Sequence, residues 1–339
     1  MNDSAIIGYS FETARHRTTW IEAGPVQGPL IVFLHGWPEL GLIWRRQIEH
    51  FAARGWRCIA PDMRGYGGSS RPDSTSAYAI REIVTDMLEL HDALGATPAV
   101  WIGHDWGSAV AWSMASHHPE RCRGVGNICV PYLAQGFVLG NLLPLVDRSL
   151  YPEDRFPAGQ WDYWLYYREH FTRAARVFEA DVVATLAAVY QAAPVRESAA
   201  TAFTADIRAQ GGWFGGGERP LSASLDSVLL RKQDFEAFVA AFSVTGFSGA
   251  NAWYMNDVAN RAFAAEAVNF GRISIPALFI HATRDTVCDT TQTKLAESMR
   301  EDCLHLTEVT IEGGHELMLE RPDTLNAAIA NWLAPEALC

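Results

Sequence analysis

The sequence predicts an α/β fold in which a mostly parallel central sheet is flanked by helices and interrupted by a mainly helical cap. Three observations favour this fold. In the first third of the chain, short runs that are apolar on both faces alternate with helix-length segments, which is typical of parallel strands covered on both sides. The strand pattern stops after residue 131, and it returns near residue 277. We therefore expect a core of residues 1–131 and 268–339 and a cap of residues 132–267.

The apolar runs and the helical patterns place the individual elements. The predicted strands are residues 30–34, 57–60, 99–102, 125–130, 277–281 and 306–311. The first four are followed within two residues by glycine or proline, which interrupt a strand. The predicted helices are residues 79–94, 108–115 and 324–333 in the core and 160–168, 174–191 and 232–242 in the cap, where residues 211–217 form a glycine-rich loop.

Composition and charge exclude several classes of function. Hydrophobic residues make up 49% of the chain and charged residues 19%, as in a globular protein. The net charge of −12 disfavours nucleic acid and an anionic membrane surface as partners, because both bind basic patches. The N-terminus has neither the basic start nor the apolar stretch of a signal peptide, so we expect a soluble cytoplasmic protein.

Neither the cysteines nor the histidines form a metal-binding motif. The six cysteines contain no C-x-x-C pair, and we expect reduced thiols that mostly fill the core. They are Cys58, Cys122, Cys129, Cys288, Cys303 and Cys339. His315-Glu316 resembles the start of a zinc-binding H-E-x-x-H motif, but Leu319 occupies the position of the second histidine. We expect no metal and no cofactor.

The segment 103–107, Gly-His-Asp-Trp-Gly, joins a predicted strand to a predicted helix. Its two glycines leave room for a sharp turn that pushes the central side chain out of the sheet, as in a nucleophile elbow. The central residue is Asp105, so the candidate nucleophile is a carboxylate. Taken alone, the motif is equally compatible with Asp105 capping the helix that follows.

Two further residues complete a candidate catalytic triad. His315 follows the last predicted strand, and Asp285 lies in the loop after the preceding strand. The chain order is therefore nucleophile, acid and histidine, as in α/β-hydrolases. In some relatives the acid follows the strand that ends near residue 130, but residues 124–131 contain no Asp or Glu. Asp289 is a weaker competitor, since it lies four residues beyond Asp285.

The turn at residues 35–38, His-Gly-Trp-Pro, follows the first long apolar strand. This position supplies one backbone N–H of an oxyanion hole, and the residue after the nucleophile supplies the other. The oxyanion donors are therefore expected to be the amides of Trp37 and Trp106. We expect His35 and His104 to have structural roles beneath the site.

These motifs resemble those of the α/β-hydrolase-fold epoxide hydrolases of the soluble type. The matching segments are residues 35–39, 64–70, 103–108 and 313–315, spread over nearly the whole chain. The resemblance implies an α/β-hydrolase fold and the conversion of an epoxide and water to a vicinal diol.

Two cap segments add the most specific part of this resemblance. Residues 162–167 and 245–254 are similar to the two lid-tyrosine segments of the family, although Ala252 and Met255 depart from the second pattern. By this resemblance Tyr163 and Tyr254 are the acids that open the epoxide ring. Tyr166 and Tyr167 are expected to belong to the cap core.

The chemistry of epoxide opening needs these residue types. A carboxylate that attacks carbon forms an ester with the enzyme, and a base must then activate water to release it. His315 suits that role when Asp285 fixes its tautomer. The opened epoxide is an alkoxide, a poor leaving group that needs a proton, and tyrosine with a pKa of ~10 can donate one at neutral pH.

Alternatives and partners follow from the same residues. A haloalkane or fluoroacetate dehalogenase would use the same aspartate but needs no proton donor, and a non-catalytic ligand-binding protein would not need the whole triad. A serine esterase is disfavoured because the elbow has no central serine.

The tryptophans of the cap suggest that the substrate is a small apolar or aromatic epoxide. The one protein partner that we consider is a second copy of the chain, in a homodimer. The predicted substrate-binding residues are Trp37, Pro38, Trp106 and Trp164.

Overall fold

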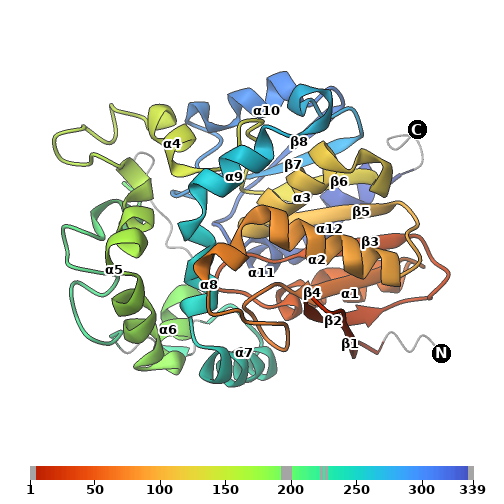
Figure 1. Cartoon of the computed structure of the whole chain (residues 1–339), viewed down its shortest axis with the longest axis horizontal. Helices are drawn as coiled ribbons and strands as arrows, with labels where there is room; N and C mark the ends of the chain where they lie inside the picture. The colour runs from red at the N-terminus through yellow and green to blue at the C-terminus, as the bar shows by residue number, and fades with distance from the viewer. Residues whose placement is uncertain (1–4, 192–200, 222–223, 226–227, 335–339) are drawn as a thin grey trace.

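A single eight-stranded sheet forms the centre of the molecule, with the strand order β1-β2-β4-β3-β5-β6-β7-β8 (Figure 1). The computed structural model describes residues 5–191, 201–221, 224–225 and 228–334. The strands are β1 (Ile7–Glu12), β2 (Arg17–Ala23), β3 (Leu30–Leu34), β4 (Arg57–Asp62), β5 (Ala99–His104), β6 (Cys122–Ile128), β7 (Ala277–Ala282) and β8 (Leu306–Ile311). Strands β3 to β8 are parallel, whereas β1 and β2 are antiparallel to their neighbours, so the sheet is mostly parallel, as predicted.

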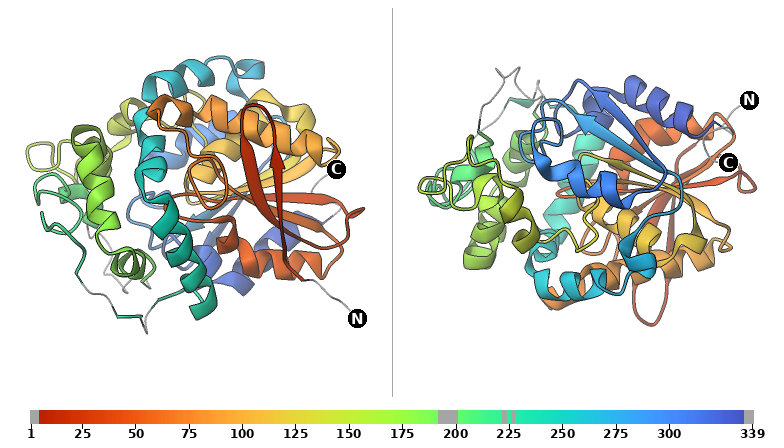
Figure 2. Two further views of the ribbon diagram at one scale, coloured as in Figure 1. Left: turned by 60° about the horizontal axis from the view of Figure 1, so that its bottom comes forward. Right: turned by 90° about the horizontal axis from the view of Figure 1, so that it is seen from above.

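Helices cover both faces of this sheet (Figure 2). The helices are α1 (Arg45–Ala52), α2 (Ile80–Ala93), α3 (Trp106–His117), α4 (Leu139–Leu142), α5 (Asp162–Glu179), α6 (Val182–Val189), α7 (Lys232–Thr245), α8 (Ser248–Ala252), α9 (Asp257–Ala264), α10 (Glu297–Asp302), α11 (Leu317–Glu320) and α12 (Pro322–Trp332). Helices α2 and α3 pack together on one face, and α1, α11 and α12 pack together on the other. In α2 the buried residues Ile83, Met87 and Leu90 recur every three or four positions, which gives the helix one apolar face.

The parallel strands bring the segments that carry chemistry to one edge of the sheet. Every residue of β3, β5 and β7 is buried, as expected for strands covered on both faces. Leu34 of β3 pairs with Gly103 of β5, and Ala282 of β7 pairs with Ile311 of β8. The loops that follow these strands therefore meet at the same edge, where ligands bind in open α/β sheets.

The described residues between β6 and β7 add helices α4 to α9 and no strand to this sheet. Figures 1 and 2 show α4, α5 and α6 at one end of the molecule, away from both chain termini. Helix α5 continues to Glu179 through a non-helical residue, His170, so the predicted break before residue 174 is wrong. The interruption between helices lies instead at Asp181, just before α6. The carboxylate of Asp181 accepts a hydrogen bond from the backbone N–H of Ala184 and caps α6.

Strands β1 and β2 were not expected from the sequence. Most of β1 is solvent-exposed, so it lacks the apolar run by which the other strands are recognised. Strand β6 also begins earlier than predicted, at Cys122, and it ends at Ile128. The next residue, Cys129, has a φ of 67°, which turns the chain out of the sheet.

Two further expectations concern the membrane and the cysteines. None of the described helices is long and apolar enough to cross a membrane. The five cysteines that the structure describes are free and buried, as predicted, and Cys339 lies outside the described residues.

Candidate active site

The candidate nucleophile stands on a sharp turn between β5 and α3. Asp105 has φ 49° and ψ −124°, outside the regions that residues with a Cβ ordinarily adopt. The turn is possible because its neighbours are glycines: a Cβ on Gly103 would lie 2.4 Å from the carbonyl oxygen of Gly107, and one on Gly36 would lie 2.3 Å from the Asp105 side chain. The segment therefore has the geometry of a nucleophile elbow.

The structure brings His315 and Asp285 to this elbow. Nδ1 of His315 lies 2.6 Å from Oδ2 of Asp285, and Nε2 lies 3.7 Å from Oδ2 of Asp105. The second oxygen of Asp285 accepts hydrogen bonds from the N–H groups of Val287 and Cys288, which hold the carboxylate in place.

Asp289, the competing acid, has a different environment. Its Oδ1 accepts hydrogen bonds from the N–H groups of Thr291 and Gln292 and from the hydroxyl of Thr291. The carboxylate of Asp289 thus stabilises its own turn, and Asp285 is the acid that the structure places against His315.

Electrostatic interactions fix the charges of the three residues. Burial alone would lower the pKa of His315, but the charge of Asp285 and the nearby Asp105 outweigh it and hold this pKa well above its usual value. Burial would raise the pKa of both carboxyls, but His315 keeps each of them below its usual value. In this structure the triad is therefore an imidazolium between two carboxylates.

The predicted oxyanion donors flank the nucleophile. The backbone N–H of Trp37 donates a 2.7 Å hydrogen bond to Oδ1 of Asp105. Trp106 is the first residue of α3, so its N–H has no carbonyl partner within the helix and is at the positive end of the helix dipole. Beneath them, His35 is buried and accepts a hydrogen bond from the N–H of Met63, in line with a structural role.

Tyr163 and Tyr254 come from different elements, α5 and the short 3-10 helix η8 (Trp253–Met255), and they meet above Asp105. Their ring centroids are 5.5 Å apart. Burial raises the pKa of both hydroxyls well above the usual value, so both tyrosines are protonated at neutral pH. Tyr166 and Tyr167 are buried, as predicted for the cap.

These residues share a cavity of about 440 Å³. The candidate residues Asp105, Tyr163, Tyr254, Asp285 and His315 all line it. Its apolar lining includes Trp37, Phe178, Val189, Phe203, Trp213 and Phe214. A cavity of this size with a few convergent polar groups is typical of a small-molecule site.

Three of the four predicted substrate-binding residues do not line this cavity. Trp37 does, whereas Pro38, Trp106 and Trp164 are absent from its described lining. The indole N–H of Trp164 donates a 2.7 Å hydrogen bond to the carbonyl oxygen of Tyr254, so this side chain supports the tyrosine from behind. The Trp106 ring packs against the Tyr254 ring, with 5.1 Å between the ring centroids.

Two buried acids near His104, Glu39 and Glu316, received no role from the sequence. Ligand atoms of Glu39, His104 and Glu316 all lie within 4.8 Å of one another. Glu39 accepts a hydrogen bond from the N–H of Gly36 and lies 2.8 Å from Nδ1 of His104, whose Nε2 lies 2.9 Å from the carbonyl oxygen of His315. These hydrogen bonds occupy both carboxyl oxygens of Glu39 and both ring nitrogens of His104, and they tie these two residues to the backbone of the base.

These contacts determine which atoms of His104 and Glu39 carry a proton. A carbonyl oxygen can only accept, so Nε2 of His104 carries a hydrogen and Nδ1 of the neutral ring accepts one from Glu39. Burial raises the pKa of Glu39 to about 8 and that of Glu316 to about 8, which agrees with a protonated Glu39. Glu39 stands in the 35–39 motif, but the motif alone gives no sign of this proton.

Comparison with known proteins agrees with this architecture. The family described as alpha/beta hydrolase fold matches residues 29–322. Epoxide hydrolase A of Mycobacterium tuberculosis is 34% identical over 317 residues, which cover 92% of each chain. Bifunctional epoxide hydrolase 2 of Sus scrofa is 31% identical over 97% of this chain, which spans 55% of that longer protein.

Solved structures give the same result. The crystal structure of epoxide hydrolase A from Mycobacterium thermoresistibile is similar with a TM-score of 0.79 and 30% identity, covering 98% of this chain and 99% of the other. An epoxide hydrolase from an endophytic Streptomyces has a TM-score of 0.77 at 27% identity, over 98% of this chain and 96% of the other. The chain therefore belongs to the α/β-hydrolase fold family and, within it, to the epoxide hydrolases.

Proposed function

We propose that this protein hydrolyses an epoxide to a vicinal diol through an ester formed on Asp105. The observation that carries the proposal is one cavity lined by a carboxylate on a nucleophile elbow and by two protonated tyrosines. A carboxylate can attack an epoxide carbon, and a phenol can protonate the oxygen that leaves it. Family membership, established above, supports the same reaction.

In the first step Asp105 attacks one epoxide carbon, and the carbon–oxygen bond of the ring breaks. Tyr163 or Tyr254 donates its proton to the departing oxygen, which becomes the first hydroxyl of the diol. The other carboxyl oxygen of Asp105 becomes the ester carbonyl, held by the N–H of Trp37. In the second step this N–H stabilises the oxyanion that forms when water adds to the ester.

Alkylation also converts His315 into a base. The ester carries no charge, so one of the two carboxylates that hold the proton on His315 is lost. His315 can then release that proton, and the tyrosinate left by ring opening takes up one proton, so the charge of the site is conserved. Neutral His315, oriented by Asp285, accepts a proton from the water that cleaves the ester.

The remaining expectations belong to the same proposal. Residues 132–267 act as the cap and supply both tyrosines, while residues 1–131 and 268–339 supply the triad. The aromatic lining of the cavity favours an apolar or aromatic epoxide. A cytoplasmic location and a homodimer remain predictions, for which cell fractionation and light scattering are the tests.

The dehalogenase alternative needs donors for a halide. The indole N–H of Trp37 is already donated to Oδ1 of Asn251, 3.0 Å away. The experiment that tests the proposal is diol formation from styrene oxide by the purified protein, with Asp105→Ala as the inactive control. No diol from any epoxide, together with halide release from a haloalkane or fluoroacetate, would replace the proposal with the dehalogenase.

A further inference from the structure

One acid in the lining of the 440 Å³ cavity, the main cavity, has an oxygen without a hydrogen-bond partner. Glu316 directly follows the base His315, is 8% exposed and lines this cavity. Its Oε2 is buried and makes no hydrogen bond within the described residues. Buried polar atoms are nearly always hydrogen-bonded, because an unmade bond destabilises the fold. We therefore expect a molecule that enters the cavity to be the partner of this carboxyl group.

Other polar side chains of the lining are bound to the protein itself. Glu320 accepts a 2.9 Å hydrogen bond from the N–H of Gly314. The hydroxyl of Thr204 donates a 2.7 Å hydrogen bond to the carbonyl oxygen of Gln160. These two side chains have a structural partner, whereas Oε2 of Glu316 has none within the same described residues.

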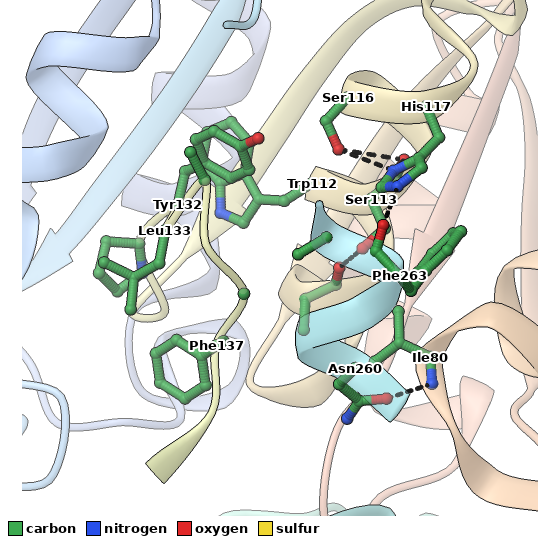
Figure 3. Close-up of a pocket in the computed structure, with 15 residues that line it drawn as sticks. Ile80, Trp112, Ser113, Ser116, His117, Tyr132, Leu133, Phe137, Asn260 and Phe263 are labelled. Atoms are coloured by element: carbon green, nitrogen blue, oxygen red, sulfur yellow. Dashed lines mark hydrogen bonds between the residues drawn. The ribbon is translucent and has the colours of Figure 1, made fainter. Parts of the chain in front are cut away.

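A second, smaller cavity of about 40 Å³ is lined by residues of α3 and α9 (Figure 3). Its lining includes Ser113 and Ser116 of α3 and Asn260 of α9, and its described residues carry no carboxyl group. The small cavity and the main cavity share no described lining residue. The water that attacks an ester on Asp105 is therefore held by the lining of the main cavity, to which Asp105 and Glu316 both belong.

Glu316 belongs to the core and lies beside groups that hold the reacting residues. Ligand atoms of Glu316, Glu39 and His104 are within 4.8 Å of one another. Glu39 is bonded to the N–H of Gly36 in the oxyanion turn, and His104 is bonded to the carbonyl oxygen of His315. Burial raises the pKa of Glu316 to about 8, and the charge of His315 acts in the opposite direction. The carboxyl group is thus within electrostatic reach of the base and is protonated at neutral pH.

The epoxide and the water are bound from different sides in the proposed mechanism. The cap tyrosines hold the epoxide oxygen, whereas the base that must contact the water belongs to the core. We propose that the carboxyl group of Glu316 holds the water that cleaves the ester on Asp105. This inference rests on the proposed function.

The water uses its two hydrogens differently in this step. One is donated as a hydrogen bond to a carboxyl oxygen of Glu316, which can accept whether or not the group is protonated. The other passes as a proton to Nε2 of His315 while the water oxygen bonds to the ester carbon of Asp105. Glu316 gains no proton, so its contribution is to orient the water.

Glu316→Met and Glu316→Gln test the inference at one position. The two new side chains are similar in length, but only the amide oxygen of glutamine is a good hydrogen-bond acceptor. We expect Glu316→Met to slow ester hydrolysis by about 10- to 100-fold, because the water is no longer oriented, and to leave alkylation near the parent rate. Glu316→Gln should hydrolyse the ester close to the parent rate. With excess styrene oxide, the ester on Asp105 should accumulate in Glu316→Met and be visible by intact-protein mass spectrometry.

Thermal unfolding separates this role from a structural one. Because Oε2 of Glu316 bonds to no described residue, Glu316→Met should unfold at or above the melting temperature of the parent protein. Glu316→Leu also lacks an acceptor and replaces Glu316→Met if that variant is unfolded. Ser113→Ala is the control, because it removes a polar group from the small cavity and should leave both steps unchanged.

Three results would overturn the inference while leaving the proposed function intact. Hydrolysis at the parent rate in folded Glu316→Met or Glu316→Leu would show that the carboxyl group does not hold the water. Slower alkylation with unchanged hydrolysis would show that it binds the epoxide. Equal slowing of hydrolysis in Glu316→Gln or Ser113→Ala would show that the lost hydrogen bond is not the cause. No diol from styrene oxide or any other epoxide with the parent protein would instead overturn the proposed function.

Discussion

Nε2 of His315 lies 3.7 Å from Oδ2 of Asp105, close enough for their charges to attract but too far for a direct hydrogen bond. The contact contributes to the raised pKa of His315, together with Asp285. It exists only while Asp105 is charged. Forming an ester on Asp105 therefore changes His315 from a stable imidazolium into a group that can lose its proton.

The two chemical steps should consequently differ in their dependence on pH. Alkylation needs charged Asp105, whose pKa lies below 3.8, so its rate should change little between about pH 5 and 8. Ester hydrolysis needs neutral His315, so its rate should rise with pH and level off above the pKa of His315 in the alkylated enzyme. Stopped-flow tryptophan fluorescence can follow both steps, because Trp37 and Trp106 flank Asp105. A hydrolysis rate that falls as pH rises through the same range would exclude His315 as the base.

The buried proton on Glu39 predicts an unusual effect on stability. The pKa of Glu39 is about 8 in the fold and near 4.5 when unperturbed, so the folded protein holds a proton that the unfolded chain releases between those values. The contribution of Glu39 to the stability of the parent protein should therefore fall as pH rises through this window. Glu39→Gln keeps both contacts, because its amide can accept from Gly36 and donate to His104.

Melting temperatures from pH 5 to pH 8 check this prediction. The melting temperature of Glu39→Gln, relative to that of the parent protein, should rise with increasing pH. Glu12→Gln, a change at an exposed position, should melt at the same temperature as the parent protein at each pH. A Glu39→Gln variant that loses ground as pH rises would show that Glu39 is ionised in the fold.

The two acids of the loop after β7 should respond differently to the same change. Asp285→Asn removes the charge that holds the His315 tautomer, and it should slow ester hydrolysis by roughly 10²- to 10⁴-fold with a smaller effect on alkylation. Asp289→Asn keeps an oxygen that can accept from Thr291 and Gln292, so it should be nearly silent. Single-turnover rates of both steps distinguish the variants, and the reverse order would make Asp289 the acid.

The tyrosines should affect alkylation and leave the fold intact. Tyr163→Phe or Tyr254→Phe removes one hydroxyl from a shared site, so each should slow alkylation by no more than about 10²- to 10⁴-fold. The double change should abolish ring opening, because both donors are lost. Thermal unfolding serves as the control for packing. Double-Phe protein that alkylates at the parent rate would assign the proton to another group.

Strand and motif positions could be predicted from the sequence because they depend on local chemistry. Strand β3 was expected at its observed bounds, since a run of five buried apolar residues is visible as such. The elbow was recognisable because the turn at Asp105 requires glycines at fixed places. Strand β1 has no comparable signal, because an exposed edge strand needs no apolar run.

The walls of the cavity could not be predicted in the same way. Phe178 lines the cavity whereas Trp164 is packed behind Tyr254, yet both are large apolar residues of α5. The spacing of apolar residues shows which side of a helix is buried, but not whether a cavity or packed protein covers it. The proton on Glu39 likewise depends on burial in the folded protein and on the contact with His104, which is distant in the chain.

A single turnover in ¹⁸O-labelled water tests the covalent mechanism most directly. With enzyme in excess over styrene oxide, the oxygen that enters the diol should come from the carboxylate of Asp105, because water attacks the ester carbonyl and not the epoxide. His315→Gln should stop the reaction one step earlier, with an adduct of the substrate's mass on the Asp105 peptide. We expect unlabelled diol and one ¹⁸O atom in the Asp105 peptide, whereas ¹⁸O in the diol of the first turnover with an unlabelled Asp105 peptide would exclude an ester on Asp105.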